Sequence, residues 1–277
     1  MSVARDANVG YDIVPRRKSS YPRANEEFLD LPKVIADFIL DEKSTLHFDK
    51  STRFFLQGSC FAENLHGELS RSGYPCFYNQ LVEALNSPLA NMAYLTQLKS
   101  APDDPIRKEI EKANVYILTI GVAPSWYVKS SGQFVFAPDV HAMDLFMQRT
   151  ATVKEATDAL LDVFKTIHEI NPAIQIVITL SPVPLARTFE FASAIVADCL
   201  SKSVLRAAIH EALLGFGGGK KPIYFPSFEI VRWAGGHAGN AFGDDGLPRH
   251  ISREYVKHII SSFLSRGEEA GTAKPPL

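Results

Sequence analysis

Continuous apolar runs that alternate with amphipathic segments constrain the fold of this chain more than any other feature. "NVYILTIG" at residues 114–121 and "IQIVITL" at residues 174–180 are apolar almost throughout, as strands are when helices cover both faces of their sheet. An amphipathic helix that opens with the capping-box pattern Thr-x-x-Glu lies between them, at residues 152–170. The alternation begins near residue 51 and predicts a parallel sheet between two layers of helices.

Five strands are predicted in all, at residues 52–57, 74–79, 114–121, 174–180 and 222–231. Helices are predicted at residues 62–73, 88–98, 105–112, 152–170, 190–214 and 252–264, the last of them capped by Ser252. The segment "SWYVKSSGQFVFAP" alternates and turns at Ser-Ser-Gly, which predicts a β-hairpin beside the sheet. The predicted fold class is therefore α/β, a three-layer α/β/α domain with a five-stranded, mostly parallel sheet and a small hairpin excursion.

Composition divides the chain into three parts and argues against one kind of partner. Residues 1–50 are polar and spotted with proline, which predicts an arm or cover; residues 51–266 form the α/β domain, and residues 267–277 a disordered tail. The chain has 29 basic and 31 acidic residues, a formal charge of -2 and no cluster of Lys and Arg that resembles a nucleic-acid footprint. No nucleic-acid partner is expected.

The same composition predicts a cytoplasmic chain. The N-terminus has no apolar stretch behind its charges, and no segment approaches the roughly 20 apolar residues that span a bilayer, so no membrane insertion is expected. The 3 cysteines are odd in number and widely scattered, which argues for reduced thiols. Neither cysteines nor histidines have metal-ligand spacing, and no metal or cofactor is predicted.

Four unusual peptides follow the predicted strands. They are "GSC" at residues 58–60, "GVAP" at residues 121–124, "SPVP" at residues 181–184 and the glycine-rich segment at residues 235–250. Ligands of parallel sheets collect at the carboxyl ends of the strands, so we expect all four peptides to meet at one edge.

Cys60 stands where the first strand gives way to a helix N-terminus, and Gly58 avoids the side-chain clash of this tight corner. Backbone N–H groups and the positive end of a helix dipole lower the pKa of a thiol there and are suited to hold an oxyanion. Two interpretations of these residues stay open. Cys60 is a nucleophile, or it is a small buried filler with Ser59 as the helix N-cap.

"GSCFAENL" resembles the signature of the GSCFA-domain family, and "ILTIGVAPSWY", "TLSPVPLART", "SKSVLRAA" and "YFPSFEIV" resemble its later blocks in the same order. The similarity spans residues 51–264. This family resembles in turn the SGNH or GDSL hydrolases, which are esterases and acyltransferases with a flavodoxin-like sheet. Their Gly-Asp-Ser block has the nucleophile in third place, so the resemblance implies Cys60 as the nucleophile and Ser59 as the residue before it.

Two departures from the hydrolase pattern concern the oxyanion hole and the acid. The hydrolases carry Gly-x-Asn-Asp after the third strand, whereas this chain has "GVAP", which leaves the backbone of Gly121 to bind the oxyanion. They also end in Asp-x-x-His, whereas Asp244 and Asp245 stand six and five places before His250. The resemblance implies His250 as the base, with Asp245 ahead of Asp244 as the residue that orients its ring.

Further candidates would bind substrate at the same edge. Ser59 is one of them and stays an alternative nucleophile. Trp126 is an apolar wall, a sugar-stacking platform or a core residue. His141 would reach over the edge from behind the hairpin, and His237 is a rival base in a flexible, glycine-rich loop that could act as a lid. Lys202 could reach an anionic group of the substrate, but its usual interpretation is a solvated charge.

The leading hypothesis is an esterase or O-acyltransferase that works through a covalent Cys60 intermediate on an ester or thioester. The resemblance implies a carbohydrate-type acyl substrate, and a cysteine nucleophile is compatible with an acyl-CoA donor. The alternative is a non-catalytic module that binds a glycan or nucleotide-sugar at a decayed site. A redox role of Cys60 is a third hypothesis, weakened because no resolving cysteine lies near it in sequence.

Overall fold

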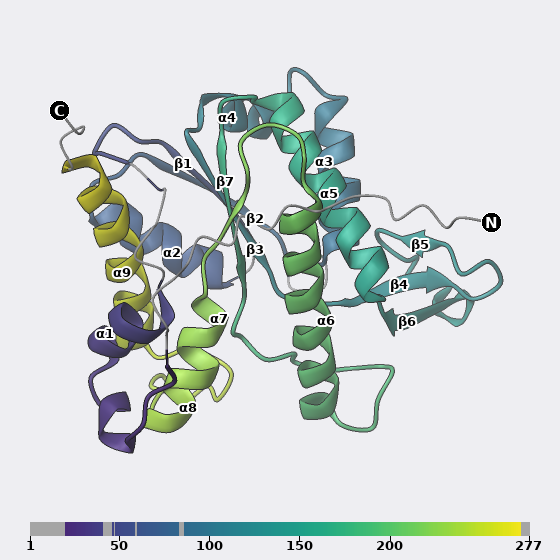
Figure 1. The fold of residues 1–277 in the computed structure, drawn as a ribbon. Coiled ribbons are helices and arrows are strands. Elements are labelled where there is room, and N and C mark those ends of the chain that lie inside the picture. The colour runs from purple at the N-terminus through teal and green to yellow at the C-terminus, as the bar shows by residue number, and fades with distance from the viewer. Residues whose placement is uncertain (1–19, 41–45, 47, 59, 83–85, 273–277) are drawn as a thin grey trace, which may run out of the picture.

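A five-stranded parallel sheet forms the centre of the molecule (Figure 1). A computed structural model describes residues 20–40, 46, 48–58, 60–82 and 86–272, with side chains up to residue 265. The strands of the sheet are β1 (Phe54–Gly58), β2 (Cys76–Gln80), β3 (Val115–Ile120), β7 (Gln175–Leu180) and β8 (Ile223–Tyr224). Their order is β2-β1-β3-β7-β8 and every pairing is parallel. This is the flavodoxin-like order, and the predicted fold class is confirmed.

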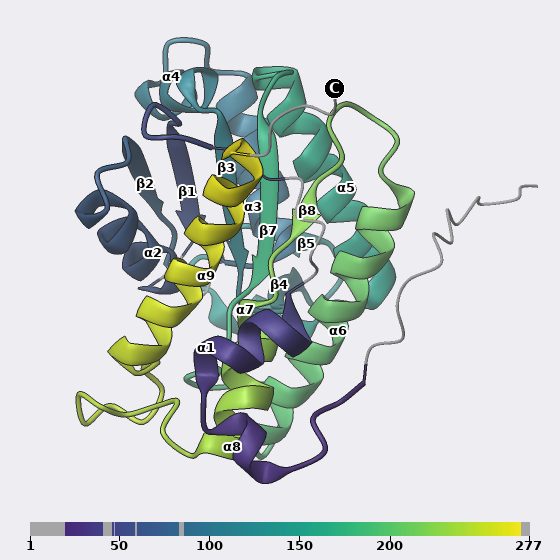
Figure 2. The same cartoon turned by 60° about the vertical axis from the view of Figure 1, so that its left-hand side comes forward.

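Helices cover both faces of the sheet (Figures 1 and 2). The larger helices are α2 (Cys60–Arg71) and α9 (Arg253–Thr272) on one face, and α3 (Pro88–Lys99), α5 (Val153–Ile170) and α6 (Ala194–Gly215) on the other, with α4 (Pro105–Lys112) beside α5. The side chains of β1 show why both layers are needed. Phe54 and Leu56 pack into the core on the α2 and α9 side, and Phe55 packs into the opposite core. None of the described helices is both long and apolar enough to cross a membrane.

α5 begins with the predicted capping box. The Thr152 hydroxyl accepts from the Glu155 N–H at 3.1 Å, and the Glu155 carboxylate accepts from the Thr152 N–H at 2.8 Å. The guanidinium of Arg149 donates two further hydrogen bonds to this carboxylate, at 2.9 and 2.6 Å. The bond from Arg149 is the largest cause that lowers the pKa of Glu155 to about 2.

We expect Glu155→Gln to lower the free energy of unfolding by about 1–2 kcal/mol at pH 6, a figure reduced because the side chain is 34% exposed. The folded-state pKa is depressed, so this contribution is present above pH 4.5 and is lost as the pH falls towards 2. Urea titrations at pH 6 and pH 2.5 should therefore show a gap between the two proteins that shrinks in acid.

The control for this experiment is Asp158→Asn, which removes an exposed pair with Lys154 from the same helix. Its effect should stay below about 0.5 kcal/mol. A gap between wild type and Glu155→Gln that is as large at pH 2.5 as at pH 6 would contradict the assigned role of the Arg149 pair.

The predicted hairpin belongs to a second, antiparallel sheet that lies to one side of the first (Figure 1). β4 (Pro124–Val128) pairs with β5 (Phe134–Val135), which confirms the hairpin. A strand that the sequence did not predict, β6 (Phe146–Thr150), pairs with the other edge of β4. Its residues are partly exposed and lack strict alternation, so partner strand β4, rather than local pattern, accounts for it.

The last strand was predicted at residues 222–231, but only Ile223–Tyr224 form a strand (β8), so the prediction is wrong beyond Tyr224. The chain turns there into a helical segment, in which the Ser227 hydroxyl donates to the Leu180 carbonyl at 3.1 Å. An apolar run fits a buried helix as well as a buried strand, and Ile230, Val231 and Ala234 are buried in helical turns while Trp233 is exposed. These turns are α7 (Ser227–Glu229), a π-helical turn (Ile230–Ala234) and α8 (Gly235–Ala238).

The start of α9 also differs from the prediction. The Ser252 hydroxyl donates to the Asn240 carbonyl instead of capping the helix, and the Asp244 carboxylate accepts from the Arg253 N–H at 2.9 Å. α9 continues to Thr272, past the predicted end of the domain at residue 266, and the rest of the predicted tail lies outside the described residues.

The described part of the predicted N-terminal arm packs onto the α9 side of the domain (Figure 2). α1 (Leu31–Val34) contacts α9, and the short turn Asn25–Phe28 contacts α8. Val34 and Ile35 are buried in the same core as Phe54 of β1. This part of the arm therefore covers and completes one face of the core, while the first 19 residues lie outside the described part of the chain.

Candidate active site

The predicted gathering of strand ends is confirmed. β1 leads to Cys60 and β3 to Gly121, and the strand order reverses between these two strands, which is where flavodoxin-like sheets bind ligands. Ser181, which follows β7, lines one cavity together with Cys60 and Gly121. The fourth segment reaches the same edge through His250, which lines a groove together with Cys60.

Gly58 makes the sharp corner between β1 and α2. Its φ is +152°, and a Cβ at this position would lie 2.8 Å from the Cβ of Thr119 and 3.1 Å from that of Ala62. Glycine is required here by this close approach, as the sequence predicts. Ser59 lies outside the described residues, so its roles as helix cap, nucleophile or substrate-binding residue stay predictions.

Cys60 is the first residue of α2, and its side chain is exposed, so its interpretation as a buried filler is wrong. The position places the thiol at the positive end of the helix dipole. The three cysteines form no disulfide. Cys76 is half-buried and burial raises the pKa of its thiol, whereas Cys199 is exposed on α6.

His250 and Asp245 form a hydrogen-bonded pair in a groove that Cys60 also lines. Nδ1 of His250 lies 2.7 Å from Oδ2 of Asp245. This bond is the first cause that lowers the pKa of Asp245, followed by the N–H of Leu247, so the carboxylate is ionised at neutral pH and accepts the Nδ1 proton. Asp244 instead accepts from the Arg253 N–H. With Nδ1 engaged, Nε2 of His250 is the ring nitrogen available for proton exchange.

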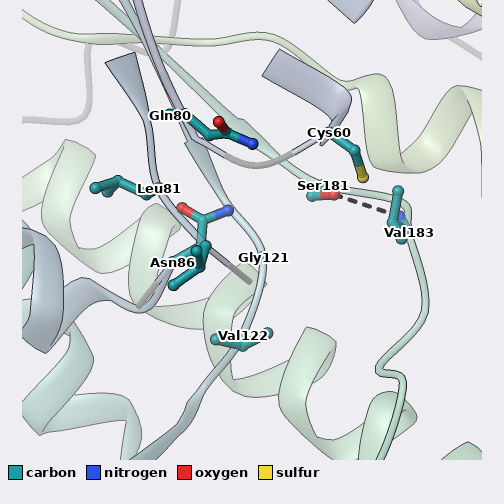
Figure 3. A pocket seen from close by; sticks show the side chains of 9 residues that line it. Cys60, Gln80, Leu81, Asn86, Gly121, Val122, Ser181 and Val183 are labelled. Atoms are coloured by element: carbon teal, nitrogen blue, oxygen red, sulfur yellow. Dashed lines mark hydrogen bonds between the residues drawn. The ribbon is translucent and has the colours of Figure 1, made fainter. Parts of the chain in front are cut away.

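Cys60 borders two hollows of different character. The smaller, of about 190 Å³, lies between the ends of β1, β2, β3 and β7 and is drawn in Figure 3. The larger is an open groove of about 760 Å³ between α2 and the start of α9. Besides His250, the groove is lined by side chains of both charges, which are Glu63, Glu68, Arg71, Asp244, Asp245, Arg253 and Lys257.

Asn86 is the site residue that sequence reasoning missed. It follows β2, lines the smaller cavity and is 1% exposed, and neither its Nδ2 nor its Oδ1 has a hydrogen-bond partner. Its backbone carbonyl accepts from the N–H groups of Gly121 and Val122, at 3.0 and 3.2 Å. The Gly121 N–H is therefore already engaged, which corrects its expected role as an oxyanion donor. Gly121 instead leaves room for Asn86, since a Cβ there would lie 3.0 Å from Nδ2.

Lys202 is hydrogen-bonded to the loop after β3 and is buried, so it is not the expected solvated charge. It is 3% exposed and its Nζ donates to the Gly121 carbonyl at 2.5 Å. Asp198 lies 4.0 Å from this Nζ and also pairs with Arg232 at 2.5 Å. The buried charges thus link α6 to the loop that carries Gly121.

Trp126 and His141 are not brought to Cys60. Trp126 lies in β4 and packs against Phe189, with ring centroids 5.7 Å apart. His141 is exposed beyond β5, and its N–H donates to Asp139 at 2.9 Å. Neither residue is among the described residues that line the two hollows, so the expected contacts with substrate find no support in the fold.

His237 lies in the helical turn α8, where a flexible loop was expected. Its ring stacks on Phe28 with 3.9 Å between centroids, and its Nε2 lies 3.0 Å from the Tyr21 hydroxyl. The N-terminal arm therefore contacts this ring, which stays exposed, and His237 is not among the described residues that line the two hollows. The described residues also contain no group of three or more His, Cys, Asp or Glu placed to hold a metal ion.

The fold and the site together define a flavodoxin-like α/β protein with a cysteine, a histidine and an aspartate at the carboxyl edge of its sheet. The model of the GSCFA family matches residues 93–263, which is more than half of the chain, and the chain belongs to this family. The matched residues include Gly121, Asp245 and His250 and begin after Cys60.

Three solved structures illustrate what the chain is similar to. A GDSL-like lipase from Parabacteroides merdae is 11% identical, with 81% of this chain and 99% of that chain covered and a TM-score of 0.48. A carbohydrate esterase family 3 protein from Talaromyces cellulolyticus is 8% identical, with 76% and 94% covered and a TM-score of 0.39. The periplasmic domain of a lipopolysaccharide acetyltransferase from Salmonella ser. Paratyphi A is 13% identical, with 86% and 88% covered and a TM-score of 0.38. No curated protein matches the chain in sequence.

Proposed function

We propose that the protein is an acyl-transfer enzyme in which Cys60 is the nucleophile, His250 the general base and Asp245 the residue that orients the imidazole. One observation carries the proposal. The exposed thiol of Cys60 and the ring of His250 line the same groove, and Asp245 holds the far nitrogen of that ring at 2.7 Å. A nucleophile, a base and a third group that orients the base are the parts that nucleophilic catalysis requires.

In the first half-reaction the thiol gives its proton to Nε2 of His250, and the sulfur attacks the carbonyl carbon of an ester or thioester. The carbonyl oxygen becomes an oxyanion, which the N–H groups in the first turn of α2 stabilise. When the tetrahedral intermediate collapses, the bond to the leaving group breaks and the imidazolium returns the proton to that group. The products are an acyl-Cys60 thioester and a free alcohol or thiol.

In the second half-reaction a hydroxyl group of the acceptor loses its proton to His250 and attacks the thioester carbonyl. Collapse of this intermediate breaks the bond to sulfur, and His250 returns the proton to Cys60. The charged groove favours a polar substrate portion over a long alkyl chain, because an alkyl chain would desolvate these side chains without pairing them. A carbohydrate hydroxyl or its acyl ester suits these polar groups.

The proposal is tested by intact-mass spectrometry after incubation with 4-nitrophenyl acetate and with acetyl-CoA. We expect wild type to gain one acetyl group that hydroxylamine removes, as a thioester requires, and peptide mapping should locate it on Cys60. Cys60→Ala should gain none. An adduct on Cys199 alone, or equal adducts on both proteins, would contradict the proposal.

A further inference from the structure

The side-chain amide of Asn86 is a polar group for which the fold provides no partner. Asn86 lines the smaller cavity and is only 1% exposed. Both polar atoms of its side chain are therefore shielded from solvent, and neither has a hydrogen-bond partner. Leaving such an amide unsatisfied costs about 1–3 kcal/mol. Figure 3 shows Asn86 and Cys60 on opposite sides of the cavity, with the amide nitrogen of Asn86 turned towards the cavity.

A network of buried side chains fixes the backbone that carries this amide. The next residue, Ser87, caps α3 by accepting from the Ala90 N–H, and its carbonyl accepts from Nδ2 of Asn91 at 2.8 Å. Oδ1 of Asn91 accepts in turn from Gln57 of β1 at 2.6 Å. Because the Asn86 carbonyl also binds the loop after β3, the residue is tied to β1, β3 and α3 at once.

The first two N–H groups of the loop after β3 are not available to bind an oxyanion, because both donate to the Asn86 carbonyl. Gly121 lacks a side chain, which is what lets Nδ2 of Asn86 occupy the space beside it. The cavity of about 190 Å³ is larger than the 150 Å³ or so that accommodates a benzene ring, so a small acyl group fits between Asn86 and Cys60.

We propose that Nδ2 of Asn86 donates a hydrogen bond to the acyl carbonyl oxygen during attack by Cys60, and that the smaller cavity is the acyl subsite. This inference rests on the proposed function. A fixed donor that acquires its partner when the oxyanion forms stabilises the transition state more than the ground state. Its substitution should therefore lower the rate of acylation without weakening the fold.

The experiment compares wild type, Asn86→Ala and Asn86→Asp in two reactions of the same thiol. Acylation by 4-nitrophenyl acetate passes through an oxyanion, whereas alkylation by iodoacetamide is a direct displacement at carbon that forms none. We expect Asn86→Ala to acetylate Cys60 about 100-fold more slowly, with KM changed less than about 3-fold, and to alkylate it within about 3-fold of the wild-type rate. Asn86→Asp lacks the donor, keeps the shape and should be slowed at least as much.

The matched control for stability is Asn91→Ala, which removes a buried amide that does have partners. It should lower the melting temperature by about 5 °C, whereas Asn86→Ala should melt at or above the wild-type temperature. The proposal is overturned if Asn86→Ala acetylates at the wild-type rate, if its alkylation falls as far as its acetylation, or if it melts as early as Asn91→Ala. If wild type forms no acyl adduct at all, the proposed function fails first and this inference falls with it.

Discussion

Cys60→Ala is expected to lower turnover of 4-nitrophenyl acetate by at least about 1,000-fold and to leave the melting temperature within about 2 °C of wild type. The loss is large because the covalent route disappears with the sulfur, and removal of a nucleophile costs about as much as removal of the whole catalytic set. Stability should change little because the Cys60 side chain is exposed, and substitutions at exposed positions usually alter the free energy of unfolding by less than about 0.5 kcal/mol.

Two measurements check this prediction, the steady-state release of nitrophenol and a thermal melt. Cys199→Ser is the matched control, since it removes a second exposed thiol and should keep full turnover. A Cys60→Ala protein that retains more than a tenth of wild-type turnover would show that sulfur at this position is not the nucleophile. Ser59, the alternative nucleophile, would then take its place.

His250→Ala is expected to reduce turnover by about 100-fold to 10,000-fold, the range in which a positioned general base contributes. Asp245→Asn should lower turnover by up to about 10,000-fold, because it leaves the imidazole in place but no longer accepts its Nδ1 proton, which favours the wrong tautomer. The effects should not add, because the two residues act as one unit. The turnover of the double variant should therefore lie within about 3-fold of the turnover of His250→Ala.

The adjacent carboxylate provides the control for this pair. Asp244 accepts from the Arg253 N–H at the start of α9, so Asp244→Asn should lower the free energy of unfolding by about 1 kcal/mol and leave turnover within about 3-fold of wild type. If Asp244→Asn reduces turnover as much as Asp245→Asn does, the pairing with His250 is not what matters at this position.

The three central strands, β1, β3 and β7, could be predicted from sequence because they are buried along almost their whole length. β3 is buried at every position, and a strand with helices on both faces needs apolar side chains throughout. The two segments that the sequence did not resolve lack this property. β6 is held by pairing with β4, and the helical turns after β8 bury apolar residues that would equally suit a strand.

Cys60 was suggested by its place at a strand end, and His250 and Asp245 by the resemblance to the hydrolases; the structure brings all three to one groove. Asn86 was not predicted, because "NSP" marks a turn in any chain, and what distinguishes this turn is the contact of its carbonyl with Gly121 and Val122. A signal was present in "GVAP", which has no side-chain donor. The donor that we propose comes instead from the end of β2, which pairs with β1.

The surroundings of His237 could not be predicted from its local sequence. Its glycine-rich neighbours predict a mobile loop, whereas Gly235 lies in a helical turn so close to Ala241 that a Cβ there would lie 2.5 Å from that residue. The arm residue that stacks on the ring, Phe28, is more than 200 positions away in sequence. Contacts between residues so far apart in sequence cannot be predicted from the local sequence pattern, so the position of this histidine could be determined only from the structure.

The most direct test of the Cys60–His250 pair is the rate of iodoacetamide alkylation, measured peptide by peptide from pH 5 to pH 9 in wild type and in His250→Ala. We predict that at pH 6 wild-type Cys60 reacts at least about 10-fold faster than exposed Cys199, and that loss of the imidazole abolishes this advantage. Should Cys60 instead follow the titration of an ordinary thiol near pH 8.5 in both proteins, the sulfur has no activating partner and the proposed chemistry is refuted.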